Sequence, residues 1–162
     1  QIIKNSMKKL IIIFLFFTTS LLAGKVERLG FYNLQELLED DNLTYKIIKS
    51  CVSLNSAITE ITKKDYPKLS KSFFETANYL YPFGILTLAK IKKINYKDAE
   101  KEYLTSVSAQ VSDYMDFMKE NGVANQSFIK GTFIGDDLNF CNEIRSAIEI
   151  TISETKKLKS QD

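Results

Sequence analysis

Residues 43–63 read LTYKIIKSCVSLNSAITEITK, and the rest of the architecture can be worked out from this segment. Its apolar residues recur at steps of four and three, which is the period of one face of an α-helix. No Gly or Pro interrupts the run. We therefore expect a long helix here, with its apolar face buried against other helices. That face consists of Ile47, Cys51, Leu54, Ile58 and Ile61.

Three more segments toward the C-terminus show the same period. The second helix is capped by Asp65, with Pro67 in its first turn, where a missing N–H costs little. The third helix starts after Asn95 and ends at residues 121–122, where Gly supplies a left-handed cap. The last helix covers about residues 137–157. The apolar stripes of the second, third and last helices are, in that order, Leu69, Phe73, Ala77, Leu80, Leu88 and Ile91; Ala99, Tyr103, Val107, Val111, Tyr114 and Met118; and Cys141, Ile144, Ile148 and Ile152.

Pro82 interrupts the second stripe. A proline at this place removes one helical hydrogen bond and crowds the carbonyl of Asn78. We therefore expect a kink, or a break into two helices, near residues 81–84. No alternating run is long enough for a strand. The sequence predicts an all-α fold, a four- to five-helix bundle that forms a single domain over residues 24–162.

Two segments lie outside these helices. Residues 25–32 are expected to be a loosely attached lead-in to a short amphipathic turn that Asn33 caps. Residues 122–136 form the longest irregular stretch, yet several of their side chains are too apolar for a solvated loop. We expect this stretch to fold over one end of the bundle, with a short extra helix as one option. The apolar side chains are Phe128, Ile129, Phe133 and Ile134.

Cys51 and Cys141 are the chain's two cysteines, one on the stripe of the first long helix and one on that of the last. Two core-facing cysteines in an exported chain favour a disulfide. The alternative is that two small core residues happen to be Cys. A disulfide needs Cα atoms within about 7 Å. In a strictly alternating bundle it therefore requires staggered helix ends, or a crossover by residues 122–136 that makes the two helices parallel.

The N-terminal segment has the pattern of a signal peptide. Lys8 and Lys9 precede eight consecutive apolar residues, and the stretch that follows, TTSLLA over residues 18–23, ends at Ala23. We expect residues 1–23 to be removed near Ala23, with Ser20 as the other cleavage position. The rival reading is a membrane anchor, but a spanning helix needs about 20 mostly apolar residues. The prediction is a periplasmic or secreted protein with no stable membrane insertion after cleavage.

Removal of residues 1–23 also changes the charge. The segment holds three of the 22 basic residues and no acidic one, which leaves 19 basic against 20 acidic residues. Of the basic residues, only Arg28 and Arg145 are arginines, the residue type that suits bidentate recognition of phosphates and bases. A near-neutral, arginine-poor domain argues against nucleic-acid binding.

The chain contains no histidine. This excludes Ser-His-Asp and Cys-His catalysis and most zinc and haem ligation. Asp136 and Asp137 are interpreted as caps of the last helix. Because no other motif carries chemistry, we expect neither catalytic residues nor a cofactor or metal site, and the chain is predicted not to be an enzyme.

The remaining hypothesis is an interaction protein with an unknown protein partner, in the manner of accessory, inhibitor or immunity proteins. The alternative is a periplasmic carrier of a small apolar ligand, with an enclosed pocket near the proline of the second helix. Both hypotheses use aromatic side chains near Pro82 or in residues 122–136. The candidate surface residues are Phe73, Tyr79, Tyr81, Phe83, Phe128 and Phe133.

Overall fold

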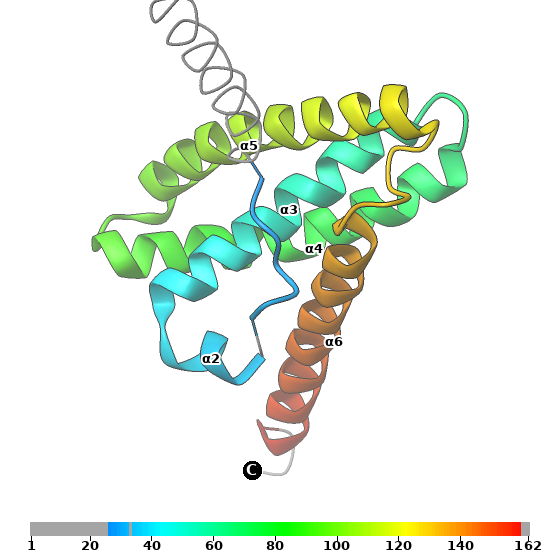
Figure 1. The fold of residues 1–162 in the computed structure, drawn as a ribbon. Coiled ribbons are helices and arrows are strands. Elements are labelled where there is room, and N and C mark those ends of the chain that lie inside the picture. The colour runs from blue at the N-terminus through cyan, green and yellow to red at the C-terminus, as the bar shows by residue number, and fades with distance from the viewer. Residues whose placement is uncertain (1–25, 33, 160–162) are drawn as a thin grey trace, which may run out of the picture.

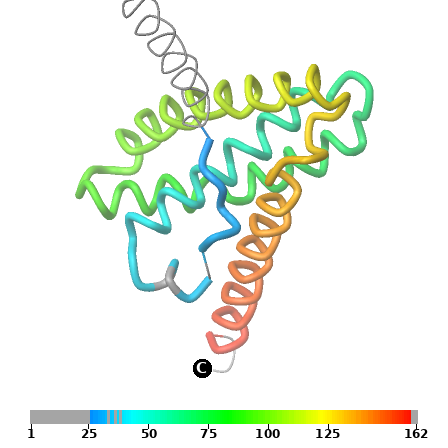
Figure 2. The backbone as a smooth tube through the Cα atoms, in the orientation of Figure 1, coloured from blue at the N-terminus to red at the C-terminus, as the bar shows by residue number. Residues whose placement is uncertain are grey.

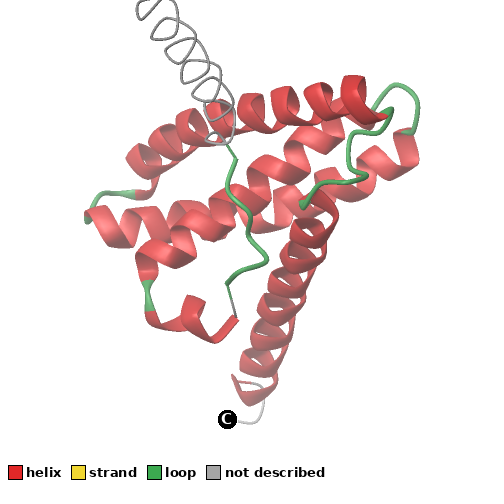
Figure 3. Cartoon of the chain, viewed as in Figure 1, coloured by secondary structure: helices red, strands yellow, loops and turns green. Residues whose placement is uncertain are grey.

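The computed structural model describes residues 26–32 and 34–159, which form helices and loops without a strand (Figure 3). Four long helices and one short helix account for most of them, so the predicted all-α bundle of four to five helices is confirmed. The signal peptide predicted over residues 1–23 and the cap predicted at Asn33 lie outside the described residues. The helices are α2 (Leu34–Glu39), α3 (Asp41–Thr62), α4 (Pro67–Lys92), α5 (Tyr96–Asn125) and α6 (Ile134–Lys159).

Helix α3 is the central element, because it contacts all four other helices (Figure 1). It begins after Asp40, whose carboxylate accepts hydrogen bonds from the N–H groups of Asn42 and Leu43. The side chains of its predicted stripe are buried from Ile47 to Ile58. An apolar face that meets partners on several sides explains why α3 holds more buried residues than any other helix.

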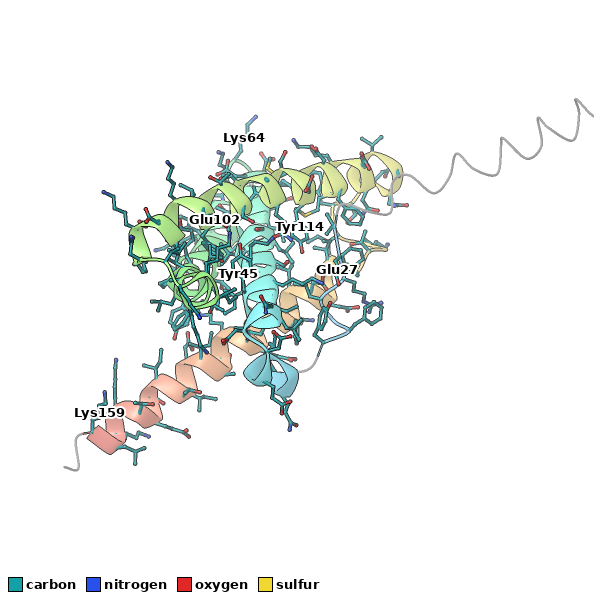
Figure 4. All side chains as sticks on the ribbon, turned by 90° about the vertical axis from the view of Figure 1, so that its left-hand side faces the viewer. Glu27, Tyr45, Lys64, Glu102, Tyr114 and Lys159 are labelled. Atoms are coloured by element: carbon teal, nitrogen blue, oxygen red, sulfur yellow. A yellow bond between two sulfur atoms is a disulfide. The ribbon has the colours of Figure 1, made fainter. Side chains whose placement is uncertain are left out.

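A disulfide joins Cys51 of α3 to Cys141 of α6, as predicted, with 5.4 Å between the two Cα atoms. The helices satisfy this distance in a way that the sequence did not indicate. Helix α6 crosses the other long helices steeply and runs away from them, instead of lying alongside α3 (Figures 1 and 4). Neither staggered ends nor a parallel arrangement is needed, because the two helices meet only where they cross.

Helix α4 continues through Pro82, which excludes a break into two helices, one of the two outcomes predicted there. Leu80 and Ile85, on either side of the proline, are fully buried. The contact between α3 and α4 is also the most extensive between any two helices. Packing of both halves against α3 therefore outweighs the loss of one hydrogen bond.

Two predicted helix ends also differ. The residue that caps α4 is Tyr66 rather than Asp65, and it makes no side-chain capping hydrogen bond. Helix α5 starts after Asn95, as predicted, but it runs past Gly122. The side chain of Asn95 caps it by accepting a hydrogen bond from the N–H of Asp98. The helix ends where Gln126 adopts the left-handed conformation, at φ 54°. Gly122 therefore has a role other than a helix cap.

Residues 26–32 are not the loose lead-in that the sequence suggested. They pass over the helices as a non-helical segment (Figure 2) and form a turn in which the N–H of Tyr32 donates to the carbonyl of Leu29 at 3.0 Å. Leu29 is fully buried in the core around the disulfide. Glu27 forms an ion pair with Lys46 of α3 at 2.6 Å, and Arg28 pairs with Asp136 of α6 at 2.9 Å. The segment thus fastens α3 and α6 to each other on the surface.

The buried side chains form two clusters. The first surrounds the disulfide and includes Tyr103, whereas the second fills the end of the molecule near the start of α6 and includes Leu54, Tyr114 and Ile134. In residues 26–32 and 34–159, no helix is long and apolar enough to cross a bilayer. The second cluster forms the base on which the loop after α5 is packed.

Candidate interaction surface

The end of α5 lies beside the turn between α3 and α4 (Figure 1). An open groove is lined by residues of these segments. Its volume is about 680 Å³. Three separate segments form the groove: the residue directly before α4, the last turns of α5, and the loop that follows α5. The lining residues are Tyr66, Lys119, Gly122, Val123, Gln126, Ser127, Phe128 and Ile129.

The groove gathers exposed apolar side chains. The exposed fraction is 88% for Val123, 65% for Tyr66 and 46% for Phe128. Single exposed apolar side chains are ordinary, but a concave group of them is typical of a binding surface.

Gly122 makes room for the ring of Phe128. A Cβ atom at position 122 would lie 2.8 Å from Cε1 and 2.9 Å from Cδ1 of that ring. The ring therefore packs directly on the backbone of α5, and any larger residue would displace it. The glycine that the sequence interpreted as a helix cap instead allows a close tertiary approach.

Hydrogen bonds hold the loop that forms one wall of the groove. The amide of Asn121 donates to the carbonyls of Ser127 and Lys130, at 2.5 and 3.2 Å. The hydroxyl of Ser127 accepts from the N–H groups of Ile129 and Lys130, at 3.4 and 2.9 Å. Because this network fixes the loop before any partner arrives, binding here needs little ordering of the protein.

The polar groups of the groove are a cation and a set of backbone acceptors. Lys119 is the one charged residue in its lining, and it forms no ion pair within residues 26–32 and 34–159. The last carbonyls of any helix lack intrahelical donors. At the end of α5, no N–H of the described chain beyond the helix donates to the carbonyls of Gly122 or Val123.

The aromatic residues predicted from sequence divide into separate environments. Phe128 lines the groove, whereas Phe133 packs on Phe117, with 5.3 Å between ring centroids. Phe73 packs against the second buried cluster, away from the three aromatic residues near Pro82. Those three are partly buried against the first cluster, so the six predicted residues do not form one site. They are Tyr79, Tyr81 and Phe83.

Tyr66, Lys119 and Val123 belong to the groove but were not identified from the sequence. Val123 follows Gly122, and the predicted end of α5 at that glycine hid the fact that Val123 is on a helix. Tyr66 reaches the groove only because the α3–α4 turn lies next to the end of α5. The one sequence signal that pointed to this region was the irregular stretch 122–136, whose apolar side chains, Phe128 and Ile129 among them, did not fit a solvated loop.

A second feature is the buried carboxylate of Asp137 in the first turn of α6. It does not cap its own helix. Its Oδ1 accepts hydrogen bonds from the N–H groups of Leu29 and Gly30, at 2.9 and 3.1 Å, while its Oδ2 is buried without a partner among the described residues. Burial raises the pKa of Asp137 to about 6, although the two N–H groups act in the opposite direction.

This carboxylate fastens the N-terminal segment to α6, and the surrounding residues do not extend it into a catalytic or metal site. Within residues 26–32 and 34–159, no three His, Cys, Asp or Glu side chains are grouped so that they could hold a metal ion. Its neighbour Asp136 is engaged by Arg28 on the surface. The groove is therefore the stronger candidate for function.

Comparisons with protein-family models, with curated proteins and with solved structures found no match to this chain. The class that the structure defines is a small disulfide-linked, all-α helical bundle. Because a fold of this kind serves many functions, the function has to be argued from the groove itself.

Proposed function

We propose that this chain is an exported, non-catalytic protein-interaction module that binds a partner protein through the groove at the end of α5. One observation carries the proposal: exposed apolar side chains line a concave surface whose wall is fixed in advance by hydrogen bonds. Apolar burial supplies the driving force for association, and a preformed wall lowers the entropic penalty.

The lining favours binding over catalysis. It contains one charged residue, Lys119, and no acid that could act as a general base beside it. The chain also has no histidine. A nucleophile in this groove would therefore have neither a histidine nor a carboxylate beside it to act as its base.

The carrier hypothesis has less support. It needed an enclosed apolar pocket around Phe73, Tyr79 and Phe83, but these side chains pack against two different buried clusters. The groove lies elsewhere and is open along its length. An open apolar surface suits a protein segment better than a small molecule that must be shielded from water.

Export is part of the proposal. The disulfide between Cys51 and Cys141 supports an oxidising compartment, because such bonds persist outside the cytoplasm. The basic and apolar leader over residues 1–23 supports the same location. The partner is accordingly expected among periplasmic or extracellular proteins.

Site-specific photo-crosslinking tests the interaction. A photoreactive amino acid at position 123, which is 88% exposed, should give a saturable adduct with one protein of the exported fraction. The matched control is position 104 on the same helix, where Leu104 is 53% exposed outside the groove. Unlabelled protein in excess should compete for the adduct, and the Val123→Ser chain should compete less.

Equal adducts from both positions, or none from position 123, would show that the groove has no partner in that fraction. Circular dichroism of each chain confirms that folding is unchanged, since both side chains are largely solvated.

A further inference from the structure

Three chemical features of the groove restrict what can fill it. Tyr66, Val123 and Phe128 provide an apolar surface, and Lys119 places one positive charge at its edge. The carbonyls of Gly122 and Val123, in the last turn of α5, accept no hydrogen bond from a backbone N–H of the described chain beyond the helix. A complementary molecule therefore carries an apolar group, a negative charge and hydrogen-bond donors.

We propose that the groove binds an extended acidic peptide segment of the partner, with a large apolar side chain within about two residues of a carboxylate. The apolar side chain packs against Phe128 and Val123, and the carboxylate pairs with Lys119. Backbone N–H groups of the peptide donate to these carbonyls at the end of α5. This inference rests on the proposed function and specifies the chemistry of its partner.

The acceptors distinguish a peptide from a fatty carboxylate. A fatty acid matches the apolar surface and the lysine but carries no N–H donor. A peptide carries a donor at nearly every residue, so it matches all three features. The same carbonyls form the negative end of the α5 dipole, which adds a further preference for donors over lone anions at that place.

Affinity selection from a random peptide library displayed on phage tests the inference. The target is the disulfide-bonded chain, immobilised through the end of α6, where Lys159 lies far from Lys64 of the α3–α4 turn (Figure 4). We expect the enriched peptides to combine a large apolar residue with a nearby Asp or Glu. Their affinity is then measured against variants of the groove.

The variants separate the charge from the apolar surface. Lys119→Glu should weaken an acidic peptide by at least about fivefold, which corresponds to about 1 kcal/mol for a partly exposed ion pair. The same peptide with Lys in place of its acid should recover affinity for the Lys119→Glu chain. Lys101→Glu, at the other end of α5 and outside the groove, is the matched control and should leave the affinity unchanged.

Val123→Ser should also weaken binding, whereas Leu104→Ser should not. If enriched peptides lose affinity in the Val123→Ser chain but show no acidic preference and no effect of Lys119→Glu, the acidic-peptide inference is overturned while the interaction proposal survives. A library that yields no groove-dependent binder contradicts both. Binding of dodecanoate that requires Lys119, without peptide enrichment, assigns the groove to fatty acids and also overturns the inference.

Discussion

At the scale of single residues, Asp137 is a buried carboxyl group whose hydrogen bonds attach the N-terminal segment to α6. Its side chain is fully buried, and one of its oxygens holds the N–H groups of Leu29 and Gly30. Desolvation disfavours the ionised form more than these two hydrogen bonds favour it, so the pKa rises from 3.8 to about 6. The N-terminal segment is thus fastened by a group that destabilises the fold when it ionises.

This pKa shift predicts a pH dependence of stability. Between pH 3.8 and about 6 the folded chain binds more protons at Asp137 than the unfolded chain. The stability that protonation of Asp137 contributes to the fold is therefore fully present below pH 3.8 and is lost as the pH rises through 6. From pH 7 to pH 5 the free energy of unfolding should rise by about 1 kcal/mol more in the wild type than in Asp137→Asn. Urea titrations at both pH values measure the difference.

Comparison of the wild type with Asp137→Asn removes the contribution of the other carboxylates, whose titration changes stability with pH in the opposite direction. Glu27, for example, has a pKa lowered by hydrogen bonds from Lys46 and Tyr32. Asp136→Asn is the control, because it removes an exposed carboxylate and should keep most of the extra pH dependence. Parallel curves for the wild type and Asp137→Asn would mean that Asp137 does not titrate in this range.

Gly84 allows close packing between α4 and the ring of Tyr103. A Cβ atom there would lie 2.1 Å from the hydroxyl oxygen and 2.2 Å from Cζ of Tyr103, which is fully buried. Gly84→Ala should therefore destabilise the protein by about 1–3 kcal/mol through overpacking. The higher helix propensity of Ala should offset up to about 1 kcal/mol of this loss.

Gly135→Ala is the matched control for this change. Its nearest neighbour would be Cγ2 of Ile129 at 3.7 Å, an ordinary contact, so stability should stay equal or increase by up to about 1 kcal/mol. Urea unfolding measures both variants. A Gly84→Ala chain as stable as Gly135→Ala would show that Tyr103 can move aside at no cost.

At the scale of elements, the disulfide is the main attachment of α6 near its crossing with α3. It links residues 90 apart in sequence, and a loop of that length corresponds to roughly 4–5 kcal/mol in the chain-entropy model. The Cys51→Ala, Cys141→Ala chain should therefore unfold at clearly lower urea, with α6 exchanging its amide hydrogens faster than α3. Alanine avoids an unpaired thiol and a buried hydroxyl.

Equal protection of α6 and α3 in the double variant would contradict this, because it would mean that packing alone holds α6. The wild type under reducing conditions provides an independent comparison. It should match the double variant in stability if the bond, rather than the size of the side chains, is responsible.

The same elements show what could be predicted from sequence. The stripes of α3 and α6, and with them the disulfide, followed from a helical period that burial imposes directly. The end of α5 could not be predicted in this way, because Gly122 matched the signal of a helix cap although its role is to leave room for the ring of Phe128. A break at Pro82, one of the two predicted outcomes, does not occur. Local signals could not exclude it, because they do not report that Leu80 and Ile85 are buried on either side of the proline.

The groove was predictable only in part. Phe128 was singled out because its apolar side chain did not fit a solvated loop. Tyr66 and Lys119 carry no local pattern, and they become part of one surface only when the α3–α4 turn lies beside the end of α5. The crossing of α6 likewise depends on packing between distant segments, which periodicity does not encode.

At the scale of the whole molecule, the fold and the proposed export depend on each other. The structure describes the chain from Val26, and Leu29 is buried three residues further on. Cleavage after Ala23 leaves this segment intact, so it can still bind Asp137 and pair with Lys46. Under the proposed export, the disulfide would form when the chain reaches an oxidising compartment.

This coupling gives the last prediction. The exported form should begin at Gly24 by N-terminal sequencing and should resist thiol alkylation, because Cys51 and Cys141 are joined. A variant that lacks residues 1–23 should stay in the cytoplasm with both thiols open to alkylation, since glutathione keeps cytosolic cysteines reduced. Its stability should match that of the double alanine variant within about 1 kcal/mol. An exported chain with free thiols, or a leaderless cytoplasmic chain with the disulfide formed, would break the link between compartment and fold.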